Sequence, residues 1–266
     1  MIPVDRFPAL VPYLTCGWPT PEIFLDTVDV LAEVGCPFFE VGFPFSDPIA
    51  DGPTVQGTST EALEQGMDLE KCFELTAEAT RRAGIPAVAM TYANLVFHPG
   101  LEEFCRRLKE CGGAGLIVPD LSFEESEPVK QACADHGLEL VSFLAPTSSR
   151  DRRKVVAEVA QGFLYLVAVR GVTGGTSATG PELKQLISDA KAHAKCPVLV
   201  GFGVKEPQQV KDILKAGADG AIVGSALLEA MRKAGSDSKA VTAAVREFLS
   251  PLVEATKGSS NNKVCN

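Results

Sequence analysis

Short apolar runs alternate with amphipathic stretches along most of the chain. Eight runs of four to six residues are apolar almost throughout, which is typical of parallel strands buried on both faces. We expect these strands at residues 10–14, 38–41, 87–91, 115–118, 139–144, 164–168, 198–201 and 220–223. The stretches between them have helical periodicity at 23–33, 69–83, 101–111, 125–136, 152–160, 182–194 and 207–216.

Alternating strands and helices predict an α/β protein, and eight such units favour a single (β/α)8 TIM barrel. Five of the predicted helices stop at a glycine, namely Gly35, Gly84, Gly112, Gly137 and Gly217. A doubly wound open sheet is the alternative. It usually carries a glycine-rich phosphate loop after its first strand, and the sequence that follows residues 10–14 here, Thr15-Cys16-Gly17-Trp18-Pro19, is not such a loop.

The length of 266 residues suits one domain of this class. We expect the barrel to occupy residues 1–257 and the polar residues 258–266 to form a flexible tail. The first residues, Met1 to Arg6, lack the basic and apolar regions of a signal peptide, and no apolar run is longer than a strand. We therefore expect a soluble protein of the cytoplasm.

The net charge of −9 argues against nucleic acid or an anionic membrane as a partner. Any bound phosphate must then be held by local groups.

The eight cysteines include no CxxC pair and no Cys/His cluster with zinc spacing, so we expect no metal site and mostly buried thiols. Cys105 and Cys111 are six residues apart on a predicted helix, which does not favour a disulfide.

Two carboxylates stand in an apolar segment around the second predicted strand. Glu40 ends the run Phe38-Phe39-Glu40-Val41, and Asp51 lies in the loop that follows. Strand alternation places Glu40 on the inner side with Phe38 and places Phe39 and Val41 against the helices. In a barrel, loops at the carboxyl ends of the strands build the active site, so both acids are candidate catalytic groups. The structural alternative is a strand-end Glu and a turn-opening Asp.

Glycines follow the last two predicted strands, in Gly201-Phe202-Gly203 and in Gly224-Ser225-Ala226 at the start of a helix. Their backbone N–H groups, with a helix N-terminus behind them, can bind a phosphate without Lys or Arg. Tight turns are the alternative explanation. The Gly/Thr/Ser-rich stretch 171–180 has the composition of a lid, or of a plain flexible loop.

Other polar residues carry weaker signals. Tyr92 and Tyr165 lie in or just after predicted strands, where a hydroxyl can reach Glu40, although packing is the commoner role of a buried Tyr. Asp120 ends a predicted strand and is a further candidate for the site. A role as a loop or cap residue is the alternative. His98, His136 and His193 belong to no nucleophile motif, and we assign them no catalysis.

The chain resembles the tryptophan synthase α subunit family over nearly its whole length. Five segments carry the resemblance, in the order that the family has: residues 40–56 (EVGFPFSDPIADGPTVQ), 90–97 (MTYANLVF), 171–174 (GVTG), 201–203 (GFG) and 224–226 (GSA). The resemblance implies a carbon–carbon lyase that cleaves indole-3-glycerol phosphate by a retro-aldol reaction to indole and glyceraldehyde 3-phosphate. It also implies that the chain itself uses no metal and no organic cofactor.

The resemblance assigns roles to individual residues. It implies that Glu40 performs acid–base catalysis, that Asp51 binds the indole N–H, and that Tyr165, Tyr92 and Thr173 support them. It places Gly174, Gly203, Gly224 and Ser225 at the phosphate, and Phe202, Val55, Ala89 and Ile117 around the indole ring. The lid would close over substrate, with Thr173 contacting Asp51.

The resemblance also implies a partner. Family members work with a pyridoxal-phosphate β subunit, as an αββα heterotetramer, and indole passes to it through a tunnel. Pro44, Asp47, Pro48 and Asn94 would face that partner. There are two alternatives: a free-standing lyase that releases indole, and a non-catalytic activator of the β subunit.

The sequence departs from the family pattern in four places. About eight residues precede Ala9, where the family usually carries a helix, so we expect most of that helix to be missing and the barrel floor to be covered differently. Trp18 replaces a common Asp, Val169-Arg170 displaces a common Arg, and His98 replaces a common Asn. These departures concern lid closure and coupling to the partner more than the cleavage itself.

Overall fold

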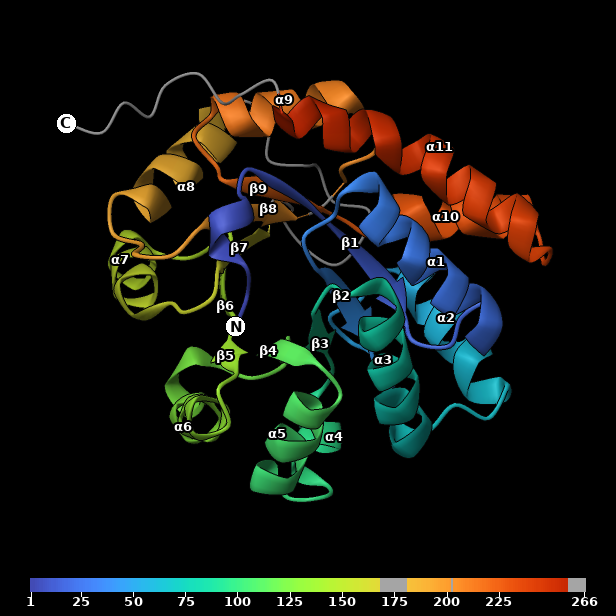
Figure 1. Cartoon of the computed structure of the whole chain (residues 1–266). Helices are drawn as coiled ribbons and strands as arrows, with labels where there is room; N and C mark the ends of the chain where they lie inside the picture. Colours follow the sequence, from blue (N-terminus) through green and yellow to red (C-terminus); the bar gives the residue numbers. More distant parts are fainter. Residues whose placement is uncertain (168–180, 202, 258–266) are drawn as a thin grey trace.

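Nine parallel strands form a barrel surrounded by helices (Figure 1). The computed structural model describes residues 1–167, 181–201 and 203–257. The strands are β1 (Ala9–Thr15), β2 (Phe39–Gly42), β3 (Ala87–Met90), β4 (Gly113–Ile117), β5 (Glu139–Leu140), β6 (Ser142–Leu144), β7 (Leu164–Val167), β8 (Val198–Gly201) and β9 (Gly220–Val223). They pair in the order β5-β4-β3-β2-β1-β9-β8-β7-β6, so β1 lies between β2 and the last strand. This sequential order confirms the predicted barrel and excludes the doubly wound sheet.

The predicted strand at 139–144 is two strands, which corrects the expected number from eight to nine. β5 pairs with β4, with Leu140 opposite Leu116, whereas β6 pairs with β7, with Ser142 opposite Leu164. Val141 lies between them, and its N–H donates to the carbonyl of Leu116 at 2.9 Å. The chain has to bend at Val141 because it changes neighbours there, and this bend is the seam of the barrel.

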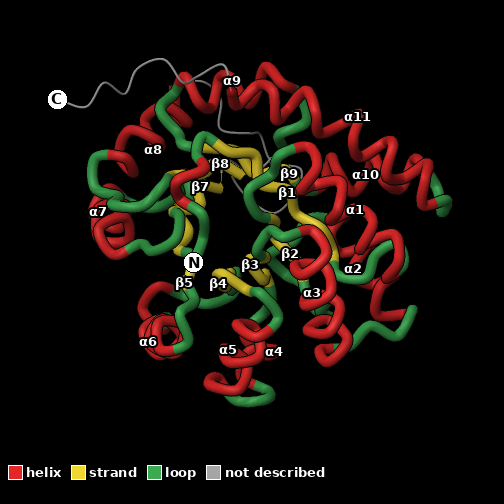
Figure 2. The backbone as a smooth tube through the Cα atoms, in the orientation of Figure 1, coloured by secondary structure: helices red, strands yellow, loops and turns green. Residues whose placement is uncertain are grey.

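The helices cover the outside of the barrel (Figure 2). They are α1 (Pro21–Val34), α2 (Pro53–Glu64), α3 (Leu69–Ala83), α4 (Ala93–Phe97), α5 (Leu101–Glu110), α6 (Glu127–Asp135), α7 (Arg150–Val159), α8 (Pro181–Lys191), α9 (Pro207–Lys215), α10 (Ser225–Ala234) and α11 (Ser238–Lys257), with short 3-10 helices η1 (Val4–Arg6) and η2 (Phe123–Glu125). The seven predicted helices are present, and Gly35 and Gly84 end α1 and α3 in left-handed conformation. The sequence did not predict α2, whose Gly57 and hydroxyl residues have low helix propensity.

Apolar side chains form an outer cluster and an interior cluster. Phe39 and Val41 pack in the outer cluster, between strands and helices, whereas Phe38 packs inside the barrel. This confirms the predicted alternation along β2. Inside, the rings of Phe38 and Phe163 lie 5.9 Å apart, and Phe163 lies 6.2 Å from Tyr165. Aromatic rings therefore fill the barrel from its floor towards the carboxyl ends of the strands.

The residues before β1 close the amino-terminal end of the barrel. Ile2 is 3% exposed within the interior cluster, and its N–H donates to a carboxylate oxygen of Glu139 at 2.9 Å. Phe7 packs edge-on against Phe38 at 6.3 Å. Figure 2 shows the N-terminus beside β5 and β7, at one side of the ring of strands. The buried Ile2 side chain and the short helix η1 thus cover the floor, in agreement with the short N-terminal segment expected there.

The described cysteines are all free, and Cys16, Cys36, Cys72, Cys105, Cys111 and Cys133 are buried. Within residues 1–167, 181–201 and 203–257, no helix has both the length and the hydropathy of a membrane span. The expected tail at 258–266 lies outside the described residues, so the division of the chain at residue 257 stays a prediction.

Candidate active site

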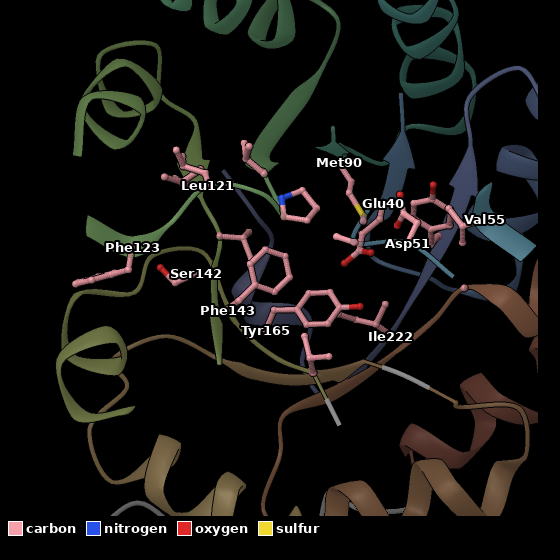
Figure 3. Close-up of a pocket in the computed structure, with 18 of the residues that line it drawn as sticks. Glu40, Asp51, Val55, Met90, Leu121, Phe123, Ser142, Phe143, Tyr165 and Ile222 are labelled. Carbon is pink, nitrogen blue, oxygen red and sulfur yellow. The ribbon is translucent and has the colours of Figure 1, made fainter. Parts of the chain in front are cut away.

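A cavity of about 450 Å³ opens at the carboxyl ends of the strands, a volume in the range of small-molecule sites. Most strands or the loops after them contribute to its wall. The residues that line it include Tyr13, Glu40, Met90, Val118, Leu140, Phe143, Tyr165 and Ile222. Figure 3 shows Glu40, Asp51, Val55 and Met90 on one side of the cavity, facing Phe143 and Tyr165. The predicted pair of acids therefore shares one cavity.

Glu40 is a buried acid that faces this cavity. Its side chain is 1% exposed, and its Oε1 atom has no hydrogen-bond partner among the described residues. Loss of hydration raises the pKa of Glu40 to about 8. At neutral pH the group is mainly protonated, and it can donate that proton to a bound molecule.

Asp51 is held by the loop after β2 and by Tyr92. The Tyr92 hydroxyl donates to Oδ2 of Asp51 at 2.9 Å and accepts from the N–H of Ala50 at 3.0 Å. Burial raises the pKa of Asp51 to about 6, and the bond from Tyr92 opposes that rise. Phe45 stacks on the Tyr92 ring at 5.1 Å. Asp51 is therefore mainly ionised at neutral pH. The Tyr92 hydroxyl binds Asp51 and not Glu40, which corrects the expectation from the sequence.

Tyr165 lines the cavity beside both acids. Its ring packs against Phe143 at 5.1 Å, and burial, followed by the charge of Glu40, raises its pKa well above the ordinary value. Its hydroxyl lies over Gly201, where an added Cβ would come within 2.2 Å of it. Among the described residues, Tyr165 donates no hydrogen bond to Glu40, so an orienting role remains a prediction.

The predicted phosphate glycines lie at the carboxyl ends of β8 and β9. Gly203, Gly224 and Ser225 line the cavity, and Ser225 is the first residue of α10. Gly203 has a φ of +73°, which favours glycine. The first residues of α10 thus lie at the cavity wall, and the N–H groups at a helix N-terminus have no partner within the helix. Thr173, Gly174 and Phe202, and the stretch 171–180, lie outside the described residues.

The predicted apolar pocket needs one correction. Val55 lines the cavity, but Ala89 packs in the outer cluster, because Val88 and Met90 are the residues of β3 that face inwards. Met90 takes the place that the sequence analysis gave to Ala89. Ile117 is fully buried in the interior cluster, opposite Met90 in the register of β3 and β4, and its contact with the indole ring stays a prediction.

Several residues of the cavity were not predicted from the sequence. Phe143, Leu121 and Ile222 are apolar positions that look like ordinary core in the sequence. Tyr13 is different, because it stands two residues after the inward-facing Val11 of the same strand, Leu10 to Leu14. Alternation along that strand would have placed a hydroxyl in the site.

The four predicted partner residues differ in exposure. Asp47 and Asn94 are exposed and Pro48 is partly exposed, but Pro44 is buried and offers no surface to a partner. Two large apolar side chains near them are exposed instead, Ile49 at 72% and Phe97 at 49%. The bond between Ala50 and Tyr92 joins the two loops that carry these residues.

A family model and individual known proteins that match this chain all point to the same family. The model of the family described as tryptophan synthase alpha chain matches residues 5–257. The tryptophan synthase alpha chain of Picosynechococcus sp. is 38% identical over 93% of each chain, and that of Chloroflexus aurantiacus is 40% identical over 92% of each.

Solved structures agree with these matches. A tryptophan synthase subunit alpha from Legionella pneumophila has a TM-score of 0.84 and 31% identity, over 94% of this chain and 93% of that one. A chain of the tryptophan synthase a2b2 complex from Pyrococcus furiosus has a TM-score of 0.84 and 33% identity, over 92% of this chain and 98% of that one.

Proposed function

The chain belongs to the tryptophan synthase alpha chain family, and from this premise we propose that Glu40 and Asp51 carry out its lyase reaction. That reaction cleaves indole-3-glycerol phosphate to indole and glyceraldehyde 3-phosphate, in tryptophan biosynthesis. The observation that supports the proposal most is the buried Glu40, whose Oε1 atom has no partner in a cavity shared with Asp51.

Glu40 acts first as an acid and then as a base. Its proton goes to ring carbon C3, which leaves positive charge on the ring nitrogen. The hydroxyl on the adjacent side-chain carbon then gives its proton to the Glu40 carboxylate and becomes the aldehyde carbonyl. The electrons of the broken carbon–carbon bond return to the ring. A pKa of about 8 suits this double role, because the group must both release and accept a proton near neutral pH.

Asp51 binds the ring N–H and stabilises the positive charge on nitrogen. With a pKa of about 6, it is mainly ionised when Glu40 is still protonated. Burial raises the two pKa values by different amounts, so the same cavity holds a neutral Glu40 and a charged Asp51. The reaction needs this combination.

The substrate phosphate binds at Gly203, Gly224 and Ser225, with Gly174 as a further contact. Backbone N–H groups and the N-terminus of α10 supply the attraction, so the acidic net charge of the chain is no obstacle. Val55 and Met90 contact the indole ring, and Phe202 and Thr173, outside the described residues, remain candidate contacts. Tyr165 completes the wall opposite Glu40.

A β subunit that carries pyridoxal phosphate consumes the indole, and the chain itself needs no cofactor. We place its contact at Asp47, Pro48 and Asn94 together with the exposed Ile49 and Phe97, because apolar side chains on the joined loops favour a protein partner. An αββα assembly in the cytoplasm follows from this proposal.

The test is a steady-state assay of indole release with and without β. Glu40→Gln should lower the rate by at least about a hundredfold, the usual contribution of a general acid–base group. Glu64→Gln, at an exposed position of α2, is the matched control and should retain the wild-type rate. Substantial turnover by Glu40→Gln would disprove the assignment. High activity without β would favour the free-standing lyase, and no cleavage in either condition would favour the non-catalytic activator.

A further inference from the structure

Two helices that contact each other carry the two ends of the cavity. α2 begins at Pro53, just after Asp51, and Val55 in its first turn lies on the same side of the cavity as Asp51 (Figure 3). α10 begins at Ser225, at the end of the cavity assigned to phosphate. Because α2 and α10 are in contact, the distance from Asp51 to the phosphate site depends on how these two helices are held together.

Gln56 connects the backbone of Asp51 to α2. Its side-chain Nε2 group donates to the carbonyl of Asp51 at 2.9 Å and to the carbonyl of Pro48 at 3.2 Å. The carboxylate at the other end of Asp51 is held by Tyr92. A displacement of α2 therefore displaces the loop that carries Asp51.

Two polar contacts join α2 to α10. Near the start of α2, the Thr54 hydroxyl donates to Oε1 of Glu229 at 3.2 Å. Further along, Nη1 of Arg232 donates to Oε1 of Glu61 at 2.6 Å. The side chains of Glu61 and Arg232 are 38% and 44% exposed, and an ion pair this exposed stabilises little by itself. A third group is needed to hold the pair in one geometry.

Trp18, in the loop after β1, supplies that group. Its side chain is 2% exposed, its ring N–H donates to Oε2 of Glu61 at 2.7 Å, and Arg232 lies over its ring at 5.2 Å. The N–H fixes the direction of the Glu61 carboxylate, and the face of the ring attracts the guanidinium. The ionised Asp that is common in the family at this position has no proton to donate.

We propose that Trp18 is a positioning residue that holds α2 against α10 through Glu61 and Arg232, and so sets the distance between Asp51 and the phosphate site. This inference rests on the proposed function. One substrate molecule must reach both ends at once, with its ring N–H at Asp51 and its phosphate at Ser225. Two ends held at the matching separation bind a linked ligand far better than its parts, and an error of about 1 Å can cost about a hundredfold in rate.

Calorimetry with two ligands tests this inference. Glyceraldehyde 3-phosphate occupies only the phosphate end, whereas an indole analogue with an unsubstituted propyl phosphate chain spans both ends and cannot be cleaved. Glu61→Gln keeps the size of the side chain but turns one of its two acceptors into a donor, which opposes either Trp18 or Arg232. It should weaken binding of the spanning analogue about tenfold and leave binding of glyceraldehyde 3-phosphate unchanged. Glu64→Gln, at an exposed position of the same helix, is the matched control and should change neither.

A double-mutant cycle tests whether Trp18 acts through Glu61. Trp18→Phe removes the N–H but keeps an aromatic ring under Arg232, and it should also weaken the spanning analogue selectively. Combined with Glu61→Gln, it should cost clearly less than the two separate effects together, because the same bond is lost in both variants. Fully additive effects would overturn the role of Trp18.

Equal weakening of both ligands in Glu61→Gln would overturn the inference, and so would unchanged binding of both. Thermal unfolding of each variant shows whether the barrel is intact, and if Trp18→Phe does not fold, the comparison of Glu61→Gln with Glu64→Gln still decides. A wild-type protein that binds neither ligand would overturn the proposed function itself, and the inference with it.

Discussion

The hydroxyl of Tyr92 donates to Oδ2 of Asp51 over 2.9 Å, from the loop that follows the next strand of the barrel. This bond stabilises the ionised form of Asp51 and opposes the effect of its burial. The pKa of Asp51, which burial raises and this bond lowers, therefore sets the lower pH limit of the site, and the pKa of Glu40 sets the upper one.

Replacing Tyr92 should move the acidic limb of the pH–rate profile. Because Tyr92→Phe removes the bond that lowers the pKa of Asp51, more of Asp51 is protonated near pH 6, and we expect the limb to move up by about one unit. The profile of kcat/KM against pH measures this shift. Phe45→Leu, which removes the ring stacked on Tyr92 but no hydrogen bond, is the control and should leave the limb in place. An unmoved limb in Tyr92→Phe would contradict the role of the bond.

The burial of Glu40 should make stability fall as pH rises. Its pKa is about 8 in the folded protein against an ordinary value of 4.5, so between these pH values the folded state holds a proton that the unfolded state has lost. The free energy of unfolding then decreases from about pH 4.5 to about pH 8, by roughly 3 to 5 kcal/mol in total. Glu40→Gln removes this dependence.

Urea unfolding at pH 5 and pH 8.5 measures the effect. The variant should be close to the wild type at pH 5 and clearly more stable than it at pH 8.5. A difference between the two proteins that does not change with pH would mean that Glu40 is hydrated in the folded state.

Gly201 should tolerate no side chain, because Tyr165 occupies the space. A Cβ there would lie 2.2 Å from the Tyr165 hydroxyl, so Gly201→Ala must displace the ring from the cavity wall. We expect about 1 to 3 kcal/mol of destabilisation and a lower kcat/KM. Gly57→Ala in α2 is the matched control, since its nearest neighbour is the end of Arg232 at 3.6 Å. This control should be neutral or slightly stabilising, and equal effects of the two changes would refute the steric argument.

Trp18 should report phosphate binding by its fluorescence, because it is the single tryptophan of the chain. Its ring N–H donates to Glu61 of α2 at 2.7 Å, and Arg232 of α10 lies over the ring at 5.2 Å. Since α10 begins at Ser225, glyceraldehyde 3-phosphate bound there should change the emission. Ser225→Leu should weaken this binding more than about tenfold. Ser236→Leu, beyond the other end of α10, should not, and an unchanged affinity in Ser225→Leu would remove the phosphate site from this helix.

Phe97 should contribute to the affinity for the β subunit. An exposed apolar ring that is replaced by a charged group loses its burial in the interface, so Phe97→Asp should raise the concentration of β needed for half-maximal activation about tenfold or more. That concentration does not depend on the basal rate. Val155→Asp, at an exposed apolar position of α7, is the control. If the two variants need the same amount of β as the wild type, the partner contacts another face.

The sequence predicted the barrel because buried parallel strands have continuous apolar runs, and it placed Glu40 correctly because alternation along β2 is regular. It did not show the bend at Val141, because an apolar residue inside an apolar run gives no sign that the chain leaves β4 and begins to pair with β7 there. Tyr92 was assigned to the wrong acid for a similar reason. Glu40 lies in β2 and Asp51 in the loop after it, and only the path of that loop decides which acid the hydroxyl meets. The sequence analysis assigned Ala89 to the cavity in place of its neighbour Met90. Successive side chains of a strand point to opposite faces, so an error of one residue places the wrong face towards the cavity.

The pairing of β1 with β9 also determines when the site can exist during synthesis. Ala9 lies opposite Gly220, so the barrel cannot close before Gly220 has left the ribosome. Tyr13, Glu40 and Asp51 are made long before that point, at about 5 to 20 residues per second. For on the order of ten seconds or more, the edge of β1 that later pairs with β9 has no partner. This is the period in which the nascent chain depends most on protection against aggregation.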